Sequence, residues 1–506
     1  MGTARGWGGH VPYILALDQG TTSTRSIVFD GDGQRLSQSQ IALEQIFPKP
    51  GWVEHDAATI WRDQLQTARA AIAEVGITAA DLSAIGVTNQ RESVVVWNRA
   101  TGIPIHNAIV WQDRRTSDTC EALVAAGHDE HVRELTGLGI DPYFSATKIA
   151  WILDHVDGAR DAAMRGELAC GTIDSWLVHN LTGGRVHVTD ITNASRTLLL
   201  DITTGEWSAE LCSLFGVVPG MLPRVVRSSE VVGQSDAEVL GAAVPIGGIC
   251  GDQQAALVGN GCFAAGDVKA TFGTGVFALM HTGETRVRSK SLATTIPART
   301  GDRIEYALEG SIFMGGAVVQ WLVEGLELGD SPAAVQALAE SVPDSGGVVF
   351  VPALTGLGAP EWDPYARGAI FGLTRGATRA HIARAGMEAI PLQVVDLVGA
   401  MVADSGHEIP ALRVDGGVTV NVLVMQTLAD LLGVPVDRAL VPESTALGAA
   451  YLAGLAVGVW SEPADLPALK GVSRTFEPAP DAAERFARLR TLWAEAVTRS
   501  LRWERP

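Results

Sequence analysis

The first part of the chain alternates short apolar runs with polar turns, a pattern typical of successive β-strands. Apolar residues dominate 13–17 and, after a polar segment, 25–30, so both are predicted strands. Asp30-Gly31-Asp32-Gly33 is a strong hairpin signal, which predicts that the chain opens with hairpin-linked strands. Residues 57–75 have the apolar spacing of a helix, and 85–88 predict another strand. Strands mixed with helices in this way indicate an α/β domain.

The second half of the chain opens with a similar order of elements. Residues 267–272 predict a strand, Gly273-Thr274-Gly275 a turn, and 276–280 a further extended segment. Later, 412–414 predict a strand that ends in Asp415-Gly416-Gly417. Each half therefore has a strand ending in a glycine-rich polar turn, but sequence identity between the halves is too low to establish a repeat.

The domain boundary has no low-complexity linker to mark it. The length of 506 residues fits two large domains or three smaller ones. We place the boundary near 255–265 and predict two domains, 11–258 and 259–503.

Composition limits the partners that the protein can have. The chain is 47% hydrophobic and 19% charged, which is ordinary for a globular protein with a sizeable core. Its formal net charge of −19 argues against nucleic acid and anionic membranes, which require a positive surface. The five cysteines form no C-x-x-C pair, as expected of reduced thiols. Without a signal-peptide core, and with the apolar stretch 446–460 too short and glycine-rich to span a membrane, we expect a cytoplasmic protein with no membrane insertion.

The turn at 18–23 is a candidate phosphate cradle. No Gly-Lys dipeptide and no strand-linked G-x-G-x-x-G occur, so the common nucleotide loops are missing. In D-Q-G-T-T-S, Gly20 permits a tight backbone turn, and three hydroxyls add to the backbone N–H groups. Asp18 can hold Mg²⁺, which prefers carboxylate oxygen, and Arg25 can add a charge-assisted contact. Taken alone, the same segment fits an ordinary polar hairpin turn equally well.

Three glycine-rich turns in sequence order carry a resemblance to a known fold. The turns at 18–23, 273–275 and 415–417 together resemble the actin-like ATPase superfold. This resemblance implies an α/β protein of two actin-like (ribonuclease H-like) domains, with an interdomain cleft for ATP and substrate.

Polar motifs make the resemblance more specific. They are T-N-Q-R-E at 88–92, V-W-Q-D-R-R at 110–115, D-P-Y-F-S at 141–145, T-I-D at 172–174, T-D at 189–190, N-A-S-R-T at 193–197, G-D-Q-Q-A at 251–255 and T-A-L-G-A-A-Y at 445–451. These motifs are similar to those of the glycerol kinases, a branch of the FGGY carbohydrate kinases, over about 13–503. The resemblance implies phosphorylation of glycerol by Mg-ATP to sn-glycerol 3-phosphate and ADP, the first step of glycerol utilisation.

The same resemblance assigns roles to individual residues. Asp252 would be the general base for the attacking hydroxyl in an in-line transfer, and Asp18 and Asp252 would hold Mg²⁺. The implied glycerol ligands are Arg91, Glu92, Trp111, Tyr143, Asp252, Gln253 and Phe277. The implied contacts to ATP or ADP are Thr21, Thr22, Ser23, Arg25, Thr274, Gly316, Gln320, Gly417 and Asn421. Relatives form dimers or tetramers, so a homo-oligomer is implied as well.

The residue types at the acceptor motif suit a small polyol. Arg91 supplies hydrogen-bond donors and Glu92 acceptors, but adjacent residues point to opposite faces of a regular strand. To share one ligand they must lie in a turn or an irregular segment. Without the resemblance, an exposed ion pair is the commoner role for such a pair, and a core position is the commoner role for Trp111 or Phe277. Asp252 begins a helical pattern and could also be an N-cap.

Several positions depart from the resemblance. Gly386 stands where relatives have a β-branched or apolar residue, and Pro391 lies inside a helical pattern, where proline costs about 3 kcal/mol. Val422 follows Asn421 where many relatives have a second Asn. Residues 234–246 lack both the basic loop used for sugar-bisphosphate inhibition and the phosphorylated histidine of some relatives, so we expect neither form of regulation.

Three alternative functions remain open. One is an FGGY kinase for a ketopentose, erythritol or a related polyol. Another is an actin-like, nucleotide-switched binding or assembly protein, which has no need for Arg91, Glu92, Tyr143 and Gln253 together. The third is a degenerate kinase that binds its substrates without turning them over.

Overall fold

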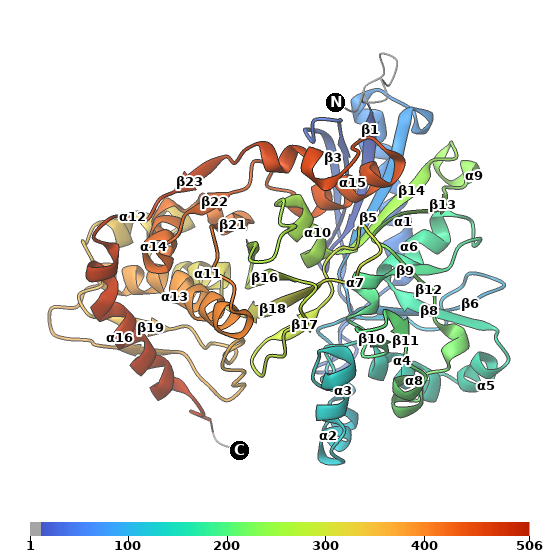
Figure 1. The fold of residues 1–506 in the computed structure, drawn as a ribbon. Coiled ribbons are helices and arrows are strands. Elements are labelled where there is room, and N and C mark those ends of the chain that lie inside the picture. Colours follow the sequence, from blue (N-terminus) through green and yellow to red (C-terminus); the bar gives the residue numbers. More distant parts are fainter. Residues whose placement is uncertain (1–11, 505–506) are drawn as a thin grey trace. The chain divides into compact units, whose positions relative to one another are not determined.

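The computed structural model describes residues 12–504, which fall into two units of mixed strands and helices (Figure 1). The first unit contains the described residues up to Phe263, together with Thr294–Tyr306 and Ser444–Lys470. The second contains Ala264–Ala293, Ala307–Glu443 and the described residues from Gly471. Two segments from the second half of the chain therefore belong to the first unit.

A six-stranded sheet of order β13-β14-β5-β1-β2-β3 forms the centre of the first unit. Its strands are β1 (Tyr13–Gln19), β2 (Ser23–Phe29), β3 (Arg35–Ala42), β5 (Leu82–Asn89), β13 (Ser229–Gln234) and β14 (Pro245–Gly251). The first three strands pair antiparallel, which confirms the predicted hairpins. In the turn between β2 and β3, Asp30 Oδ1 accepts the backbone N–H groups of Asp32 and Gln34 at 2.9 Å each.

The parallel strand pairs bring three chain segments to one edge of this sheet. Asp18 of β1 lies opposite Thr88 of β5, and Thr88 lies opposite Cys250 of β14. Because neighbouring strands are about 4.8 Å apart, Asp18 and Cys250 are about 10 Å apart along the sheet. Ligands of open α/β sheets bind outside the carboxyl ends of the parallel strands. We therefore expect a site at this edge.

Smaller sheets and helices complete the first unit. A four-stranded sheet has the order β4-β7-β6-β8, while β9 pairs with β12 and β10 with β11. These strands are β4 (Glu54–His55), β6 (Val94–Asn98), β7 (Ala108–Ile109), β8 (Leu168–Thr172), β9 (Val188–Asp190), β10 (Leu200–Asp201), β11 (Glu206–Trp207) and β12 (Arg224–Val226). The helices are α1 (Ala57–Val75), α2 (Ser117–Ala125), α3 (Asp129–Thr136), α4 (Ala146–His155), α5 (Ala159–Met164), α6 (Ile173–Leu181), α7 (Ile191–Ala194), α8 (Ala209–Phe215), α9 (Ala237–Leu240), α10 (Asp252–Gly259) and α15 (Ser444–Val457). The bounds of α1 agree with the predicted helix at 57–75, and it packs against β2 and β3.

Glycines let α15 approach the sheet and α10 very closely. A Cβ atom on Gly86 of β5 would lie 2.2 Å from the carbonyl oxygen of Ala449 in α15. A Cβ atom on Gly448 of α15 would lie 1.8 Å from the carbonyl oxygen of Ala255 in α10. Only glycine fits at either position, and the resulting contacts explain why 444–470 belongs to the first unit.

We expect Gly86→Ala to destabilise the first unit by about 3 kcal/mol, because the new Cβ would overlap the backbone of a packed helix. Gly399→Ala is a matched control, since Gly399 is exposed on a helix and a Cβ there meets no atom within 4 Å. Alanine should stabilise that helix by about 0.5–1 kcal/mol. Thermal melting followed by circular dichroism measures both effects. A Gly86→Ala protein that melts no earlier than the wild type would contradict the close packing of α15 on β5.

The second unit is built on a seven-stranded sheet of order β17-β18-β16-β15-β21-β22-β23. Its strands are β15 (Val268–Phe272), β16 (Val276–Gly283), β17 (Ala293–Thr295), β18 (Tyr306–Ile312), β21 (Leu412–Asp415), β22 (Val436–Arg438) and β23 (Arg474–Phe476), and β19 (Val349–Val351) pairs separately with β20 (Ala369–Phe371). Its helices are α11 (Gly316–Glu324), α12 (Pro332–Glu340), α13 (Arg379–Ser405), α14 (Val422–Leu432) and α16 (Ala482–Ser500). The strands predicted at 267–272, 276–280 and 412–414 are confirmed. Phe272, Val414, Leu322, Ile390 and Leu428 are part of the apolar core.

Helix α13 contains two of the residues that depart from the family pattern, Gly386 and Pro391. It continues through Pro391 without a break, so the proline does not end the helix. A Cβ atom on Gly386 would lie 2.7 Å from Leu322 Cδ1 of α11, so a larger residue there would require the Leu322 side chain to move. Helix α13 is long and apolar enough to cross a membrane, and within 12–504 it is the only helix with that length and composition. Such a segment was not expected from the sequence. However, 78% of its most apolar window is buried, as in the core helix of a globular domain.

Candidate active site

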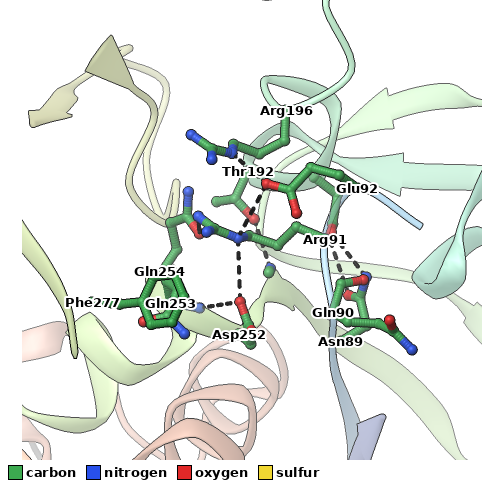
Figure 2. A network of polar contacts seen from close by, with 12 residues as sticks. Asn89, Gln90, Arg91, Glu92, Thr192, Arg196, Asp252, Gln253, Gln254 and Phe277 are labelled. Atoms are coloured by element: carbon green, nitrogen blue, oxygen red, sulfur yellow. Dashed lines mark hydrogen bonds and ion pairs between the residues drawn. The ribbon is translucent and has the colours of Figure 1, made fainter. Parts of the chain in front are cut away.

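Arg91 and Glu92 lie in the bend between β5 and β6, which confirms that they are outside a regular strand (Figure 2). They are not an exposed pair, because both side chains are only 2% exposed. Arg91 Nε lies 3.2 Å from Asp252 Oδ1 and 3.7 Å from Glu92 Oε1. Arg91 Nη1 also donates to Gln254 Oε1 at 3.2 Å. One buried guanidinium thus faces two carboxylates.

Asp252 combines a fixed position with access to solvent. It is the first residue of α10, and Gly251 occupies the N-cap position, so Asp252 is not the N-cap. Its Oδ1 accepts the backbone N–H of Gln253 at 2.7 Å as well as facing Arg91. The side chain is nevertheless 32% exposed. An ionised carboxylate held in this way can accept a proton from a bound hydroxyl.

A buried polar network supports the backbone just before Asp252. Thr192 Oγ1 accepts the Gly251 N–H at 2.8 Å and donates to Asp190 Oδ1 at 2.9 Å. Burial raises the pKa of the Asp190 carboxyl. Burial, together with the charge of Asp190, raises the pKa of Asp174 to about 7. The motif at 189–190 is part of the family resemblance, but no sequence signal assigns this supporting role to Thr192.

Arg196 connects two of the predicted glycerol ligands. Its Nε donates to Glu92 Oε1 at 2.7 Å, and its guanidinium carbon lies 5.7 Å from the centre of the Tyr143 ring. The Tyr143 ring in turn makes an edge contact with Trp111, with ring centres 5.4 Å apart. Glu92, Tyr143 and Trp111 are therefore brought together. Arg196 lies in the N-A-S-R-T motif, which is the signal that could have identified it.

The predicted phosphate turn adjoins this group. Trp111 Nε1 donates to Thr21 Oγ1 at 2.8 Å. Gln90, beside Arg91, donates through Nε2 to the carbonyl oxygen of Gly20 at 3.1 Å. The remaining predicted phosphate ligands of this unit, Thr22, Ser23 and Arg25, follow directly, in the turn and along β2. The first unit thus places the predicted glycerol ligands and the predicted phosphate turn side by side.

The two predicted magnesium ligands lie at the same sheet edge. Arg25 Nη1 is 4.0 Å from Asp18 Oδ2, and the Asp18 side chain is 14% exposed. Within 12–504, no three His, Cys, Asp or Glu side chains form a cluster suited to a metal ion. Mg²⁺ in phosphate-transfer sites usually takes one or two carboxylates and completes its shell with water and phosphate oxygens. Asp18 lies two strands from Cys250, and Asp252 follows Cys250 by two residues, so both carboxylates belong to the carboxyl ends of the same parallel strands, an arrangement suited to that mode of binding.

Predicted nucleotide ligands also come together in the second unit. The turn at 273–275 is held by the start of α11, since Gly316 N–H donates to the Gly273 carbonyl at 2.8 Å. Gly416 has a φ of 92°, and a Cβ there would lie 2.4 Å from the Phe272 carbonyl oxygen. A Cβ on Gly417 would meet no atom within 4 Å, so the turn after β21 has open space beside it. The two turns and the α11 N-terminus therefore form one contiguous cluster that includes Thr274.

Three further predicted ligands in the second unit have distinct local settings. Gln320 shares α11 with Gly316, as predicted, and donates to Glu324 at 3.1 Å. Asn421 is the N-cap of α14, where its Oδ1 accepts the Val424 N–H at 3.0 Å. Phe277 lies on β16, half-buried.

Family comparisons match most of the chain. A model of the N-terminal domain of the FGGY family of carbohydrate kinases matches residues 13–259, and a model of the C-terminal domain matches 268–457. The chain is 57% identical to a glycerol kinase of Trichlorobacter lovleyi, over 98% of this chain and 100% of the relative. It is 53% identical to glycerol kinase 2 of Thermotoga maritima, over 97% of this chain and 99% of that relative.

Solved structures agree with these sequence matches. The structure of Plasmodium falciparum glycerol kinase with ADP has a TM-score of 0.92 at 36% identity, and covers 97% of this chain and 99% of that one. Gluconate kinase from Lactobacillus acidophilus has a TM-score of 0.86 at 22% identity, over 97% and 98% of the two chains, which supports the fold alone. The predicted two-domain α/β fold of the actin-like type is confirmed.

Proposed function

Because the chain belongs to the FGGY family of carbohydrate kinases, we propose that it phosphorylates glycerol with ATP, giving sn-glycerol 3-phosphate and ADP. This reaction is the first step of glycerol utilisation. Support comes from relatives named glycerol kinase, at 53–57% identity over nearly the whole chain. The observation that carries the proposal is the buried Arg91, placed between Glu92 and the accessible carboxylate of Asp252.

The acceptor residues divide the work of binding and deprotonation. Arg91 donates to a glycerol hydroxyl and Glu92 accepts from one, while Gln253 and Tyr143 add further hydrogen bonds. Trp111 and Phe277 offer apolar surfaces for the C–H groups. Asp252 accepts the proton of the terminal hydroxyl as its oxygen attacks the γ-phosphorus in line. Positioning and charge neutralisation account for most of the catalysis in phosphoryl transfer, so one oriented carboxylate is sufficient.

The phosphate and nucleotide residues hold the other substrate. Thr21, Thr22, Ser23 and Arg25 bind phosphate oxygens, and the cluster in the second unit, which contains Thr274, Gly316, Gln320, Gly417 and Asn421, binds the rest of the nucleotide. Mg²⁺, bound by Asp18 and Asp252, would neutralise charge on the transferred phosphoryl group. The proposed domains are then 11–258, which binds the phosphates and most of glycerol, and 259–503, which binds the nucleotide and contributes Phe277. A cytoplasmic homo-oligomer, dimer or tetramer, is part of the proposal by analogy with relatives.

A panel of acceptors tests the choice of substrate. Initial rates of ADP formation are compared for glycerol, erythritol and a ketopentose at fixed Mg-ATP. We expect kcat/KM to be highest for glycerol, because Arg91 and Glu92 together offer the hydrogen-bond donors and acceptors that a small polyol needs. A ketopentose used more efficiently than glycerol would replace the proposed substrate while leaving the family assignment intact.

A further inference from the structure

Lys148 is a fully buried lysine in the first turn of α4. Its Nζ donates to three successive backbone carbonyls, those of Pro142 at 2.6 Å, Tyr143 at 2.7 Å and Phe144 at 2.8 Å. An ammonium group has three N–H donors, so each of them is used on this one loop. The loop, residues 141–145, is the one that carries Tyr143.

The position is unfavourable for a positive charge. Burial lowers the pKa of the Lys148 ammonium to about 7, although the charges of Glu92, Asp113 and Asp141 oppose this. The N-terminal turn of a helix is the positive end of its dipole, which also disfavours a cation. An apolar side chain of similar length would fill the same space without these penalties. The lysine therefore acts through its three hydrogen bonds and not through packing alone.

The loop held by Lys148 is tied directly to the acceptor residues. Ser145 Oγ donates to the backbone carbonyl of Glu92 at 3.1 Å. Within the loop, the Tyr143 N–H donates to Asp141 Oδ1 at 2.7 Å, and the Tyr143 ring contacts Trp111. The orientation of the three carbonyls thus fixes where the Tyr143 side chain lies relative to Glu92 and Trp111.

We propose that Lys148 is a positioning residue for acceptor binding, which clamps the 141–145 loop so that Tyr143 meets the acceptor hydroxyls. This inference rests on the proposed function, since it assigns Tyr143 to the acceptor site. Lys148 itself does not touch the substrate. Its loss should weaken acceptor binding and leave the binding of ATP unchanged, because the clamp contacts none of the residues assigned to the nucleotide.

The test compares steady-state constants of Lys148→Met and Lys148→Arg with those of the wild type. We expect Lys148→Met to raise KM for glycerol by about tenfold, since a misplaced Tyr143 would lose a hydrogen bond to the acceptor worth about 1–1.5 kcal/mol. KM for ATP should stay within about twofold, because no transition-state or ground-state contact to ATP is removed. Arginine keeps the charge but not the three converging donors, so the KM of Lys148→Arg for glycerol should lie between those of the wild type and Lys148→Met.

Ile152→Ala is the matched control for a purely structural effect. Ile152 is fully buried on the same helix and is not part of the carbonyl clamp. This variant should lower the melting temperature while both KM values stay close to those of the wild type. A folded Lys148→Met enzyme with unchanged KM for glycerol would overturn the proposal. The proposal would also fail if Lys148→Met and Ile152→Ala lost the same amount of melting temperature and showed the same rise in KM for glycerol.

Three further outcomes separate a failure of this inference from a failure of the proposed function. If Lys148→Met does not fold, Lys148→Arg decides: a raised glycerol KM with unchanged ATP KM supports the clamp, and wild-type constants overturn it. If the wild type prefers another acceptor, glycerol is the wrong substrate, and the Lys148 variants are judged by the KM of that acceptor. Absence of any acceptor-dependent ADP release in the wild type would remove both proposals.

Discussion

An Asp252→Asn enzyme should keep most of its ATP binding, since Asp18 remains as a proposed magnesium ligand, and lose about a hundredfold to ten-thousandfold in kcat, the usual contribution of a positioned general base. Asparagine keeps the Oδ1 atom that accepts the Gln253 N–H and faces Arg91, so the local geometry is retained. What is lost is the ability to take a proton from the attacking hydroxyl. Steady-state ADP release measures kcat, and nucleotide titration in the absence of glycerol measures ATP binding.

Asp56→Asn is a suitable control for this experiment. Asp56 also lies at the start of a helix, where its Oδ1 accepts the Ala58 N–H at 2.9 Å, but it is exposed and outside the site. Asparagine is about as good an N-cap as aspartate, so kcat should not change. If Asp252→Asn turned over nearly as fast as Asp56→Asn, Asp252 could not be the general base.

Arg91→Ala should reduce kcat/KM for glycerol by about a hundredfold, because a hydrogen bond to a charged donor contributes about 1.5–3 kcal/mol. Glu92 and Asp252 would lose the guanidinium between them, and glycerol would lose a hydrogen-bond donor. Arg196 would remain on Glu92, so the acceptor bend should keep its fold. KM for ATP should change little, because the phosphate turn is also held by backbone hydrogen bonds from Gly20 N–H to the Ser23 carbonyl at 3.0 Å and from Leu43 N–H to the Thr22 carbonyl at 2.9 Å.

The exposed Arg165 provides the comparison for this second substitution. It pairs only on the surface, with Glu167, and Arg165→Ala should leave glycerol and ATP constants as they are in the wild type. Arg91→Lys tests geometry separately from charge, since one ammonium cannot replace donors directed to two carboxylates and an amide. Full activity in Arg91→Ala would mean that glycerol is bound elsewhere.

Local features of the fold follow well from sequence patterns. The strands at β1, β2, β5, β15 and β21 follow from apolar runs between polar turns, and α1 from its apolar spacing. The bend at Arg91 and Glu92 follows from the period of a strand, because adjacent residues cannot otherwise serve one ligand. Each of these inferences uses only neighbours along the chain.

Contacts between distant segments could not be predicted in the same way. The sequence of α15 indicates an apolar helix, but it does not show that this helix packs on β5 and α10. Likewise, the sequence around Gly86 does not show that the backbone of α15 approaches this glycine. The sequence around Lys148 does not show that its Nζ donates to three backbone carbonyls four to six residues earlier in the chain. The Trp111 bond to Thr21 likewise joins residues ninety positions apart. These contacts depend on the packed tertiary structure.

The fold by itself does not determine the acceptor. Gluconate kinase of Lactobacillus acidophilus shares the fold with this chain at 22% identity. Substrate choice therefore has to lie in particular side chains, and in this chain the buried bend with Arg91 and Glu92 is where donor and acceptor groups converge. The acceptor panel and the Arg91 variants both examine this bend.

Glycerol kinase activity is measured as ADP release from Mg-ATP with and without glycerol, while sn-glycerol 3-phosphate is quantified in the same samples. We expect ADP release that depends on glycerol, with one phosphorylated product formed for each ADP. ADP release at the same rate with and without glycerol, and with no phosphorylated product, would contradict this expectation. The chain would then hydrolyse ATP as a nucleotide-switched protein instead of acting as a kinase.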